Sequence, residues 1–189
     1  VTHTLPANTF NDFNRQLLLL HQFSHEGTCM VKADLNKDGL DDLLIGGMPG
    51  QSGSLYMQTA AGKFIKKEVP AFDQDKQYQD AAIAVLDANG DGQLDIYVAS
   101  GGYHDFQPGD ERLQDRLYIN DGNLRFTRSN GLPKLLTASS VVAVEDINGD
   151  GAADLFVGGR VVPGRYPETP LSALLINDGK GNFTNAIQA

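Results

Sequence analysis

Short apolar segments alternate with turn-forming segments along the chain, and the apolar segments recur in pairs. In each pair the first segment ends at an acidic turn and the second begins just after it: 28–33 and 43–45, 81–86 and 96–98, 140–145 and 155–157. Gly and Pro cluster between the segments, and no long stretch has the period of about 3.6 residues of an amphipathic helix. The pattern predicts β-strands. Only residues 10–23 are ambiguous, between a short helix and a strand.

The two kinds of segment predict different surroundings. The first segments are rich in Ala and Val, which suits strands that crowd together near a central axis. The second segments are apolar at successive positions, so both faces of these strands should be covered by neighbouring sheets. Paired glycines follow each second segment, and we expect the strand to end before them.

A second mark follows each pair of segments and predicts a β-hairpin. An apolar pair precedes a Gly-containing turn, and a Phe comes eight residues after the second member of the pair. The three sets are Leu55-Tyr56 with Phe64, Leu117-Tyr118 with Phe126, and Leu174-Leu175 with Phe183. Each unit therefore has four predicted strands.

The units repeat along the chain. Their acidic turns begin at Asp34, Asp87 and Asp146, which are 53 and 59 residues apart, near the length of a propeller blade. We predict an all-β fold of three four-stranded antiparallel β-propeller blades at 28–75, 76–134 and 135–189, preceded by a lead-in segment, 1–27, that joins an adjacent blade. Because propellers usually need about four to eight blades to close, we expect a part of a larger propeller or closure across chains.

The acidic turns carry the candidate chemistry. Each reads D-x-N-x-D-G-x-x-D, with oxygen donors at the first, third, fifth and ninth positions, a backbone carbonyl at the seventh and Gly at the sixth for the sharp turn. Oxygen-only donors suit Ca²⁺. The predicted ligands of three calcium ions are Asp34, Asn36, Asp38, Leu40 and Asp42; Asp87, Asn89, Asp91, Gln93 and Asp95; and Asp146, Asn148, Asp150, Ala152 and Asp154.

Two other kinds of turn share parts of this pattern. Asp, Asn and Gly also make good hairpin turns without a metal, although three copies in register are hard to explain that way. An EF-hand requires Glu at the twelfth position and flanking helices, whereas Ile45, Val98 and Val157 stand there between predicted strands.

Composition and charge limit which partners and surroundings suit the protein. The chain has 15 Lys and Arg against 24 Asp and Glu, a formal charge of −9, which disfavours nucleic acid and anionic lipid as partners. The single cysteine, Cys29, excludes an internal disulfide and is expected to be a buried structural thiol. No apolar run is long enough to span a membrane. Because the sequence begins at Val1, we expect a processed or excised piece.

The acidic turn, the apolar strand and the glycine pair together resemble the FG-GAP/VCBS repeat of integrin α-chain propellers and secreted bacterial proteins. Three further segments, 12–21, 114–122 and 157–167, are similar to bacterial propeller proteins related to cartilage acidic protein, which are often joined to an ASPIC/UnbV domain. The resemblance covers nearly the whole chain and implies an exported, calcium-loaded propeller at the cell surface, in the periplasm or outside the cell.

No catalytic motif such as HExxH, GxSxG or a phosphate-binding loop is present, so we expect a non-enzymatic module for binding or adhesion to an extracellular protein or glycan. Aromatic and Arg residues in the long loops 103–114 and 160–172, on the face opposite the acidic turns, would make the contact: Tyr103, Phe106, Arg160, Arg165 and Tyr166. One alternative is the scaffold of a carbohydrate-active enzyme, a lyase or hydrolase, that uses Asp105, Asp110 and Glu111 as acid and base. Another is a calcium-stiffened spacer.

Overall fold

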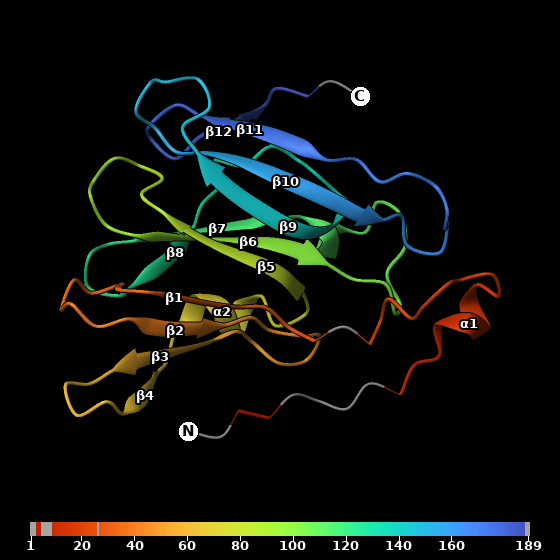
Figure 1. The fold of residues 1–189 in the computed structure, drawn as a ribbon, viewed down its shortest axis with the longest axis horizontal. Helices are drawn as coiled ribbons and strands as arrows, with labels where there is room; N and C mark the ends of the chain where they lie inside the picture. The colour runs from red at the N-terminus through yellow and green to blue at the C-terminus, as the bar shows by residue number, and fades with distance from the viewer. Residues whose placement is uncertain (1–2, 5–8, 26, 188–189) are drawn as a thin grey trace.

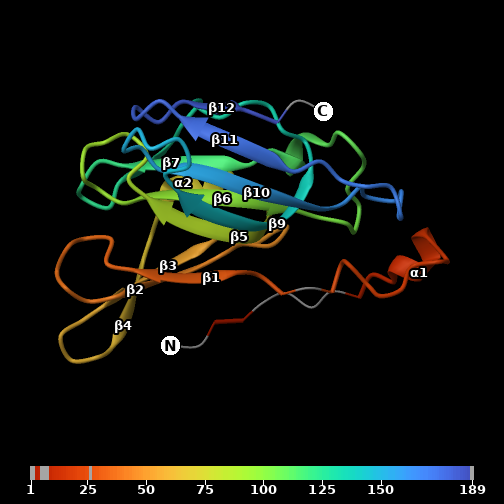
Figure 2. The ribbon, with the colours of Figure 1, turned by 45° about the horizontal axis from the view of Figure 1, so that its top comes forward.

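The computed structural model describes residues 3–4, 9–25 and 27–187, so parts of the predicted lead-in segment and the last two residues of the third unit lie outside the described residues. The chain is all-β, with three four-stranded antiparallel sheets stacked as propeller-like blades (Figures 1 and 2). Blade 1 is the sheet β1 (Met30–Ala33), β2 (Asp42–Ile45), β3 (Ser54–Gln58) and β4 (Phe64–Lys67). Blade 2 is β5 (Gln79–Leu86), β6 (Asp95–Gly101), β7 (Arg116–Asn120) and β8 (Phe126–Arg128). Blade 3 is β9 (Ala138–Glu145), β10 (Asp154–Val161), β11 (Ala173–Asn177) and β12 (Phe183–Asn185).

Strands within each blade follow one another in chain order, each antiparallel to the last. The predicted hairpins are confirmed: the three Phe residues begin the fourth strands and pair with Gln58, Asn120 and Asn177 at the ends of the third strands. First strands of neighbouring blades contact one another, β1 with β5 and β5 with β9, as expected for strands nearest the axis. Small Ala and Val side chains permit that approach.

Three short helices complete the described part of the chain. α1 (Asp12–Arg15) is a single turn in the stretch that was ambiguous in the sequence, α2 (Pro70–Gln74) joins blades 1 and 2, and η1 (Glu111–Leu113) lies in the long loop of blade 2. α1 projects to one side of the stacked blades (Figure 1). It is tied back by the Arg15 guanidinium, which donates hydrogen bonds to the backbone carbonyls of Tyr103, His104 and Phe106.

β2 ends before its paired glycines as predicted, whereas the second strands of blades 2 and 3 are longer than predicted. β6 ends at Gly101, and β10 continues through Gly158 and Gly159 with register shifts at both residues, although the strands were expected to end before the paired glycines. Close approach of the neighbouring chain explains the glycines, because a Cβ atom on Gly158 would lie 2.5 Å from Cγ1 of Val141. The glycines therefore continue the strand where a side chain would not fit.

Apolar cores fill the junctions between blades. Leu44 and Leu55 of blade 1 pack with Ile96 and Val98 of blade 2, and Tyr97 and Leu117 of blade 2 pack with Leu155 and Val157 of blade 3 in the same way. Every residue of β6 is buried because blade 2 has a neighbour on both sides. The prediction that both faces of the second strands are covered thus holds fully for blade 2 alone.

Two buried charged groups, Arg116 and Asp115, lie in blade 2. Arg116, which is 3% exposed, pairs with Asp80 at 2.5 Å and lies over the Tyr78 ring at 4.3 Å from the centroid. Asp115 accepts hydrogen bonds from the Tyr97 hydroxyl at 2.5 Å and the Ser100 amide at 2.7 Å. Burial raises the pKa of Asp115 to about 7, although both hydrogen bonds and the Arg116 charge act to lower it.

This raised pKa gives stability a pH dependence of definite sign. The folded protein keeps the Asp115 proton up to about pH 7, whereas the unfolded chain loses it near pH 4, so the free energy of unfolding falls as pH rises through this window. When the pH is lowered from 7.5 to 5 at constant calcium, the free energy of unfolding of the wild type should rise by about 2–3 kcal/mol more than that of Asp115→Asn, whose side chain carries no charge. Urea unfolding at the two pH values measures the difference. Parallel pH profiles for the two proteins would contradict this assignment.

Candidate metal centres

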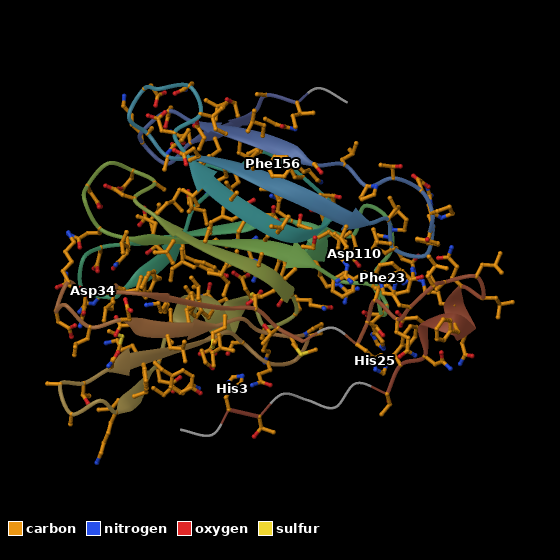
Figure 3. All side chains as sticks on the ribbon, viewed as in Figure 1. His3, Phe23, His25, Asp34, Asp110 and Phe156 are labelled. Carbon is orange, nitrogen blue, oxygen red and sulfur yellow. The ribbon has the colours of Figure 1, made fainter. Side chains whose placement is uncertain are left out.

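The three acidic turns lie at one end of the stacked blades, where each first strand passes to the second. Figure 3 labels Asp34 at this end and Asp110, in the long loop of blade 2, toward the opposite end. The sixth residue of each turn adopts the left-handed conformation, with φ of 84° at Gly39, 80° at Gly92 and 88° at Gly151. Glycine therefore supplies the sharp reversal at the position where the sequence predicted it.

The fourth position is left-handed as well, which the sequence did not reveal. Gly90 and Gly149 have φ of 74° and 77°, and Lys37 adopts φ of 60° in the first turn. A side chain in this region costs about 1 kcal/mol relative to Gly, so the first turn carries strain that the other two avoid. Comparison of the three turns position by position is the signal that could have shown this.

Side chains of the first and fifth positions organise the turns. In the first turn, Asp34 accepts from the amides of Asp38 at 3.0 Å and Gly39 at 2.8 Å, and Asp38 accepts from the amide of Leu40 at 2.8 Å. The sixth-position amide bonds to the first Asp, and the seventh-position amide to the fifth, in the second and third turns also. The backbone thus holds the donors in the same arrangement three times.

The ninth-position aspartates are more deeply buried than the other donors. Asp42, Asp95 and Asp154 are 1%, 0% and 0% exposed, whereas the predicted ligand side chains at the first, third and fifth positions are exposed or half-buried. One oxygen of each accepts from the amide of the second residue of its turn, and the other accepts from the amide of the last residue of the third strand. These aspartates fasten the turn to the rest of its blade.

Electrostatics of the turns favour neutralisation by a cation. Burial raises the pKa of Asp42 and of Asp95 above the ordinary range of a carboxyl group, and the charges of the first- and fifth-position aspartates add to the rise. The backbone amides that both groups accept from act in the opposite direction. Three carboxylates in one turn thus repel one another.

The donor set has the chemistry that a hard cation prefers, since it contains only carboxylate, amide and carbonyl oxygens. The donors bond to one another, however: the third-position Asn donates to the fifth-position Asp at 2.9 Å in the first and second turns and 2.8 Å in the third. Among the described residues, no group of three or more His, Cys, Asp or Glu side chains converges so that it could hold a metal ion. The turns supply suitable ligands, and calcium binding by them stays a prediction.

The long loops at the other end correct one expectation from the sequence. Tyr103 and Phe106 are 1% and 0% exposed and form a small core with Leu113 and Val161, so they cannot contact a partner. Arg160 is half-buried over the ring of Phe23. Aromatic side chains in a long loop can be buried within the protein itself instead of contacting a ligand. Here the loop folds over its own aromatic side chains. Arg165 is exposed and Tyr166 half-buried.

The candidate acid and base residues are held by an arginine. Arg112 bonds to Asp110 at 2.7 Å and to Asp105 at 3.1 Å, and its guanidinium lies over the Phe106 ring. Its hydrogen bonds lower the pKa of Asp110, and together with His104 they lower that of Asp105 despite burial, which alone would raise it. A general acid needs the opposite shift, and Glu111 pairs with Lys134 at the surface.

A small hollow opens beside the axis at this end. Its accessible volume is about 50 Å³, and it is lined by polar side chains of Gln79, Ser139 and Ser140 together with Phe23 and Arg160. The Ser139 hydroxyl is buried and has no hydrogen-bond partner among the described residues. Neither Ser139 nor Gln79 was singled out in the sequence, because small polar residues at the start of a strand carry no distinctive pattern.

Cys29 is a free thiol but is less buried than the sequence predicted. It is a free, half-buried thiol, and burial raises its pKa to about 12. Such a thiol stays protonated and unreactive near neutral pH. No helix in the part of the chain that the structure describes is long and apolar enough to cross a membrane.

Comparisons with known proteins agree with this architecture. The family model described as an FG-GAP-like repeat matches residues 34–98, which run from the first acidic turn into the second strand of blade 2. A lectin from Agrocybe aegerita, solved to explain its specific recognition of non-reducing terminal N-acetylglucosamine, is 23% identical with a TM-score of 0.52. The match covers 82% of this chain and 36% of the lectin, so this chain spans about a third of the lectin's length. No curated protein matches the chain.

Proposed function

We propose that the chain is a calcium-stiffened β-propeller module of an exported protein, and that it binds a glycan or protein without catalysing a reaction. The main support for this proposal is that three acidic turns hold the same oxygen donors in the same hydrogen-bonded arrangement. Each turn takes one Ca²⁺ through its side-chain oxygens and the carbonyls of Leu40, Gln93 and Ala152. The mutual bond between Asn and Asp in each turn is exchanged for the ion.

Calcium would act on the rigidity of the module. Three ions change the formal charge from −9 to about −3, which removes the repulsion among the carboxylates of each turn. Extracellular calcium modules bind with dissociation constants of about 10⁻⁴–10⁻³ M, which suits an exported protein in a calcium-rich setting. We also infer, from segments 12–21, 114–122 and 157–167, that the chain is related to the bacterial propeller proteins similar to cartilage acidic protein.

For the ligand we propose a glycan, with the hollow beside Ser139 as the contact site. The fold likeness to a lectin supports this choice, and the side chains of Gln79 and Ser140, which line the hollow and are not buried, offer hydrogen bonds to a sugar group. The hollow has room for a single substituent of a sugar ring and not for a whole residue, so recognition would concern a terminal unit. Glycan binding is favoured over glycan cleavage because the carboxylates of Asp105 and Asp110 are paired with Arg112 and are unsuited to act as a general acid.

Binding to a glycan array in calcium tests the proposal, with N-acetylglucosamine-terminated glycans included. We expect binding without turnover, at least tenfold weaker in Ser139→Val, whose side chain fills the hollow and removes the hydroxyl. Asp110→Ala, outside the hollow, is the control and should bind as the wild type does. Cleavage of a glycan that Asp110→Ala abolishes would establish the enzymatic alternative, and binding that Ser139→Val leaves unchanged would exclude the hollow.

A further inference from the structure

One face of blade 3 has no neighbour and exposes large apolar side chains. Val141, Ile147 and Phe156 are 50%, 49% and 41% exposed, and together with Glu145 we call them the free face of blade 3. Counted from the acidic turns, Ile147 and Phe156 occupy the positions of Ala88 and Tyr97 in blade 2, which are fully buried against blade 3. The same positions in blade 1, Leu35 and Leu44, are 3% exposed because blade 2 covers them. The free face of blade 3 is thus equivalent to the surfaces of blades 1 and 2 that contact the next blade.

Blade 1 carries the matching surface on its opposite side. Leu43 and Ile45 occupy the positions of Ile96 and Val98 in blade 2, and of Leu155 and Val157 in blade 3, which pack on the preceding blade. In blade 1 these two residues are half-buried, and Met30 beside them is 66% exposed. We call Met30, Lys32, Leu43 and Ile45 the free face of blade 1.

Residues 3–4, which the structure describes near this face, leave it open. His3 lies 3.2 Å from the Tyr56 hydroxyl, just as Asp75, in the connection before blade 2, lies 2.7 Å from the hydroxyl of Tyr118. Tyr56 and Tyr118 are equivalent residues of the third strands. Residues 3–4 therefore occupy the place that the connection between blades 1 and 2 takes at a filled junction, and a blade can pack beside them.

The charges on the two free faces are complementary. At the two filled junctions the first strands of neighbouring blades contact each other, and the residues at these positions are apolar: Ala33 and Val85 at one junction, and Leu86 and Val144 at the other. On the free faces the equivalent positions hold Glu145 in blade 3 and Lys32 in blade 1, and the Lys32 ammonium also pairs with Asp41 of its own blade at 2.5 Å. A pair of opposite charges thus replaces the apolar pair at the positions that would meet if the two free faces packed together.

A polar contact found at both filled junctions can also form here. The Asn120 amide nitrogen lies 3.5 Å from the carbonyl oxygen of Leu35, and that of Asn177 lies 2.9 Å from the carbonyl of Ala88 in the preceding blade. Ile147 presents the equivalent carbonyl in blade 3, and Gln58 is the equivalent amide in blade 1. The Gln58 side chain has no hydrogen bond to the described residues, and an amide is retained at this position.

From these matching faces we infer that two copies of this chain associate, with the free face of blade 3 in each packed on the free face of blade 1 in the other. Both contacts are the same by two-fold symmetry, and six blades lie within the usual range of about four to eight for a closed propeller. Lys32 of one copy meets Glu145 of the other, and Gln58 reaches the Ile147 carbonyl. A further repeat of the same type is the competing occupant of the blade 3 face.

Sedimentation equilibrium of the full chain in calcium, over a hundredfold range of concentration, tests the inference. We expect a mass of twice 20.4 kDa that Phe156→Asp reduces to the monomer. Leu17→Asp is the matched control, because Leu17 is 84% exposed and lies outside both free faces, and its mass should stay that of the wild type. Unchanged far-ultraviolet circular dichroism of Phe156→Asp shows that the blades are still folded.

Charge reversal distinguishes a second copy from any other occupant. Lys32→Glu and Glu145→Lys should each raise the dissociation constant of the dimer about tenfold, and the double variant should restore it, since only a second copy brings these two residues together. A monomer at all concentrations, larger open assemblies, or a double variant no tighter than the single ones would overturn the inference. None of these results bears on calcium or glycan binding, which are measured separately.

Discussion

Calcium at 10 mM should raise the melting temperature of this protein by about 10–20 °C over its value in EDTA. A ligand that binds only the folded state adds RT ln(1 + [L]/Kd), which is about 1.4–2.7 kcal/mol per site at 10–100 times the dissociation constant. Three sites give about 4–8 kcal/mol, and 1 kcal/mol shifts the melting temperature of a chain of this size by about 2–4 °C. Differential scanning calorimetry with and without calcium measures the effect.

The matched variant replaces the fifth-position aspartates together, as Asp38→Asn, Asp91→Asn and Asp150→Asn. Asn keeps an oxygen for the seventh-position amide but has no second oxygen to accept from the third-position Asn, so each turn loses one charge and one exposed hydrogen bond. This variant should melt in EDTA near the wild-type temperature, because relief of the repulsion offsets the lost bonds, and should gain little from calcium. Mg²⁺ should stabilise the wild type less than Ca²⁺, since it gives up its waters reluctantly. A wild-type melt that calcium leaves unchanged would refute metal binding by the turns.

Asp95→Ala should lower the free energy of unfolding by about 3–5 kcal/mol in EDTA, where no metal contributes. The carboxylate is fully buried and accepts hydrogen bonds at 2.9 Å from the amide of Ala88 and 2.8 Å from that of Asn120. Its removal leaves two buried amides without an acceptor, and each costs about 1–3 kcal/mol. Urea unfolding followed by circular dichroism gives the difference.

Two variants of the same turn separate this anchoring role from metal binding. Asp91→Ala removes an exposed carboxylate four residues away and should cost less than about 1 kcal/mol in EDTA. Asp95→Asn keeps one acceptor for the two amides and should fall between the other two variants. If Asp95→Ala costs no more than Asp91→Ala, the ninth position serves the metal alone and does not fasten the turn to the third strand.

The strands, hairpins and acidic turns were predictable from the sequence because they depend on residues close together in the chain. Alternation of apolar segments with Gly- and Asp-rich turns located all twelve strands to within a few residues, and the Phe residues marked the start of each fourth strand. The sixth-position glycines predicted the sharp turn of the chain. Local backbone preference and the oxygen chemistry of Asp and Asn are carried by the residues themselves, so repetition of one pattern was sufficient.

Contacts between distant segments were decided by the tertiary structure alone. Tyr103 and Phe106 looked like ligand-contacting residues and became core, because the loop that carries them folds against residues of the N-terminal segment and of blade 3. Tyr97 and Phe156 occupy the same position in their repeats, yet only Tyr97 is buried, because blade 2 has neighbours on both sides and blade 3 has one. The sequence by itself determined what each repeat is. Burial is a property of the neighbours that a residue meets in space, so only the stacking of the blades decided which repeat positions became core, anchor or open surface.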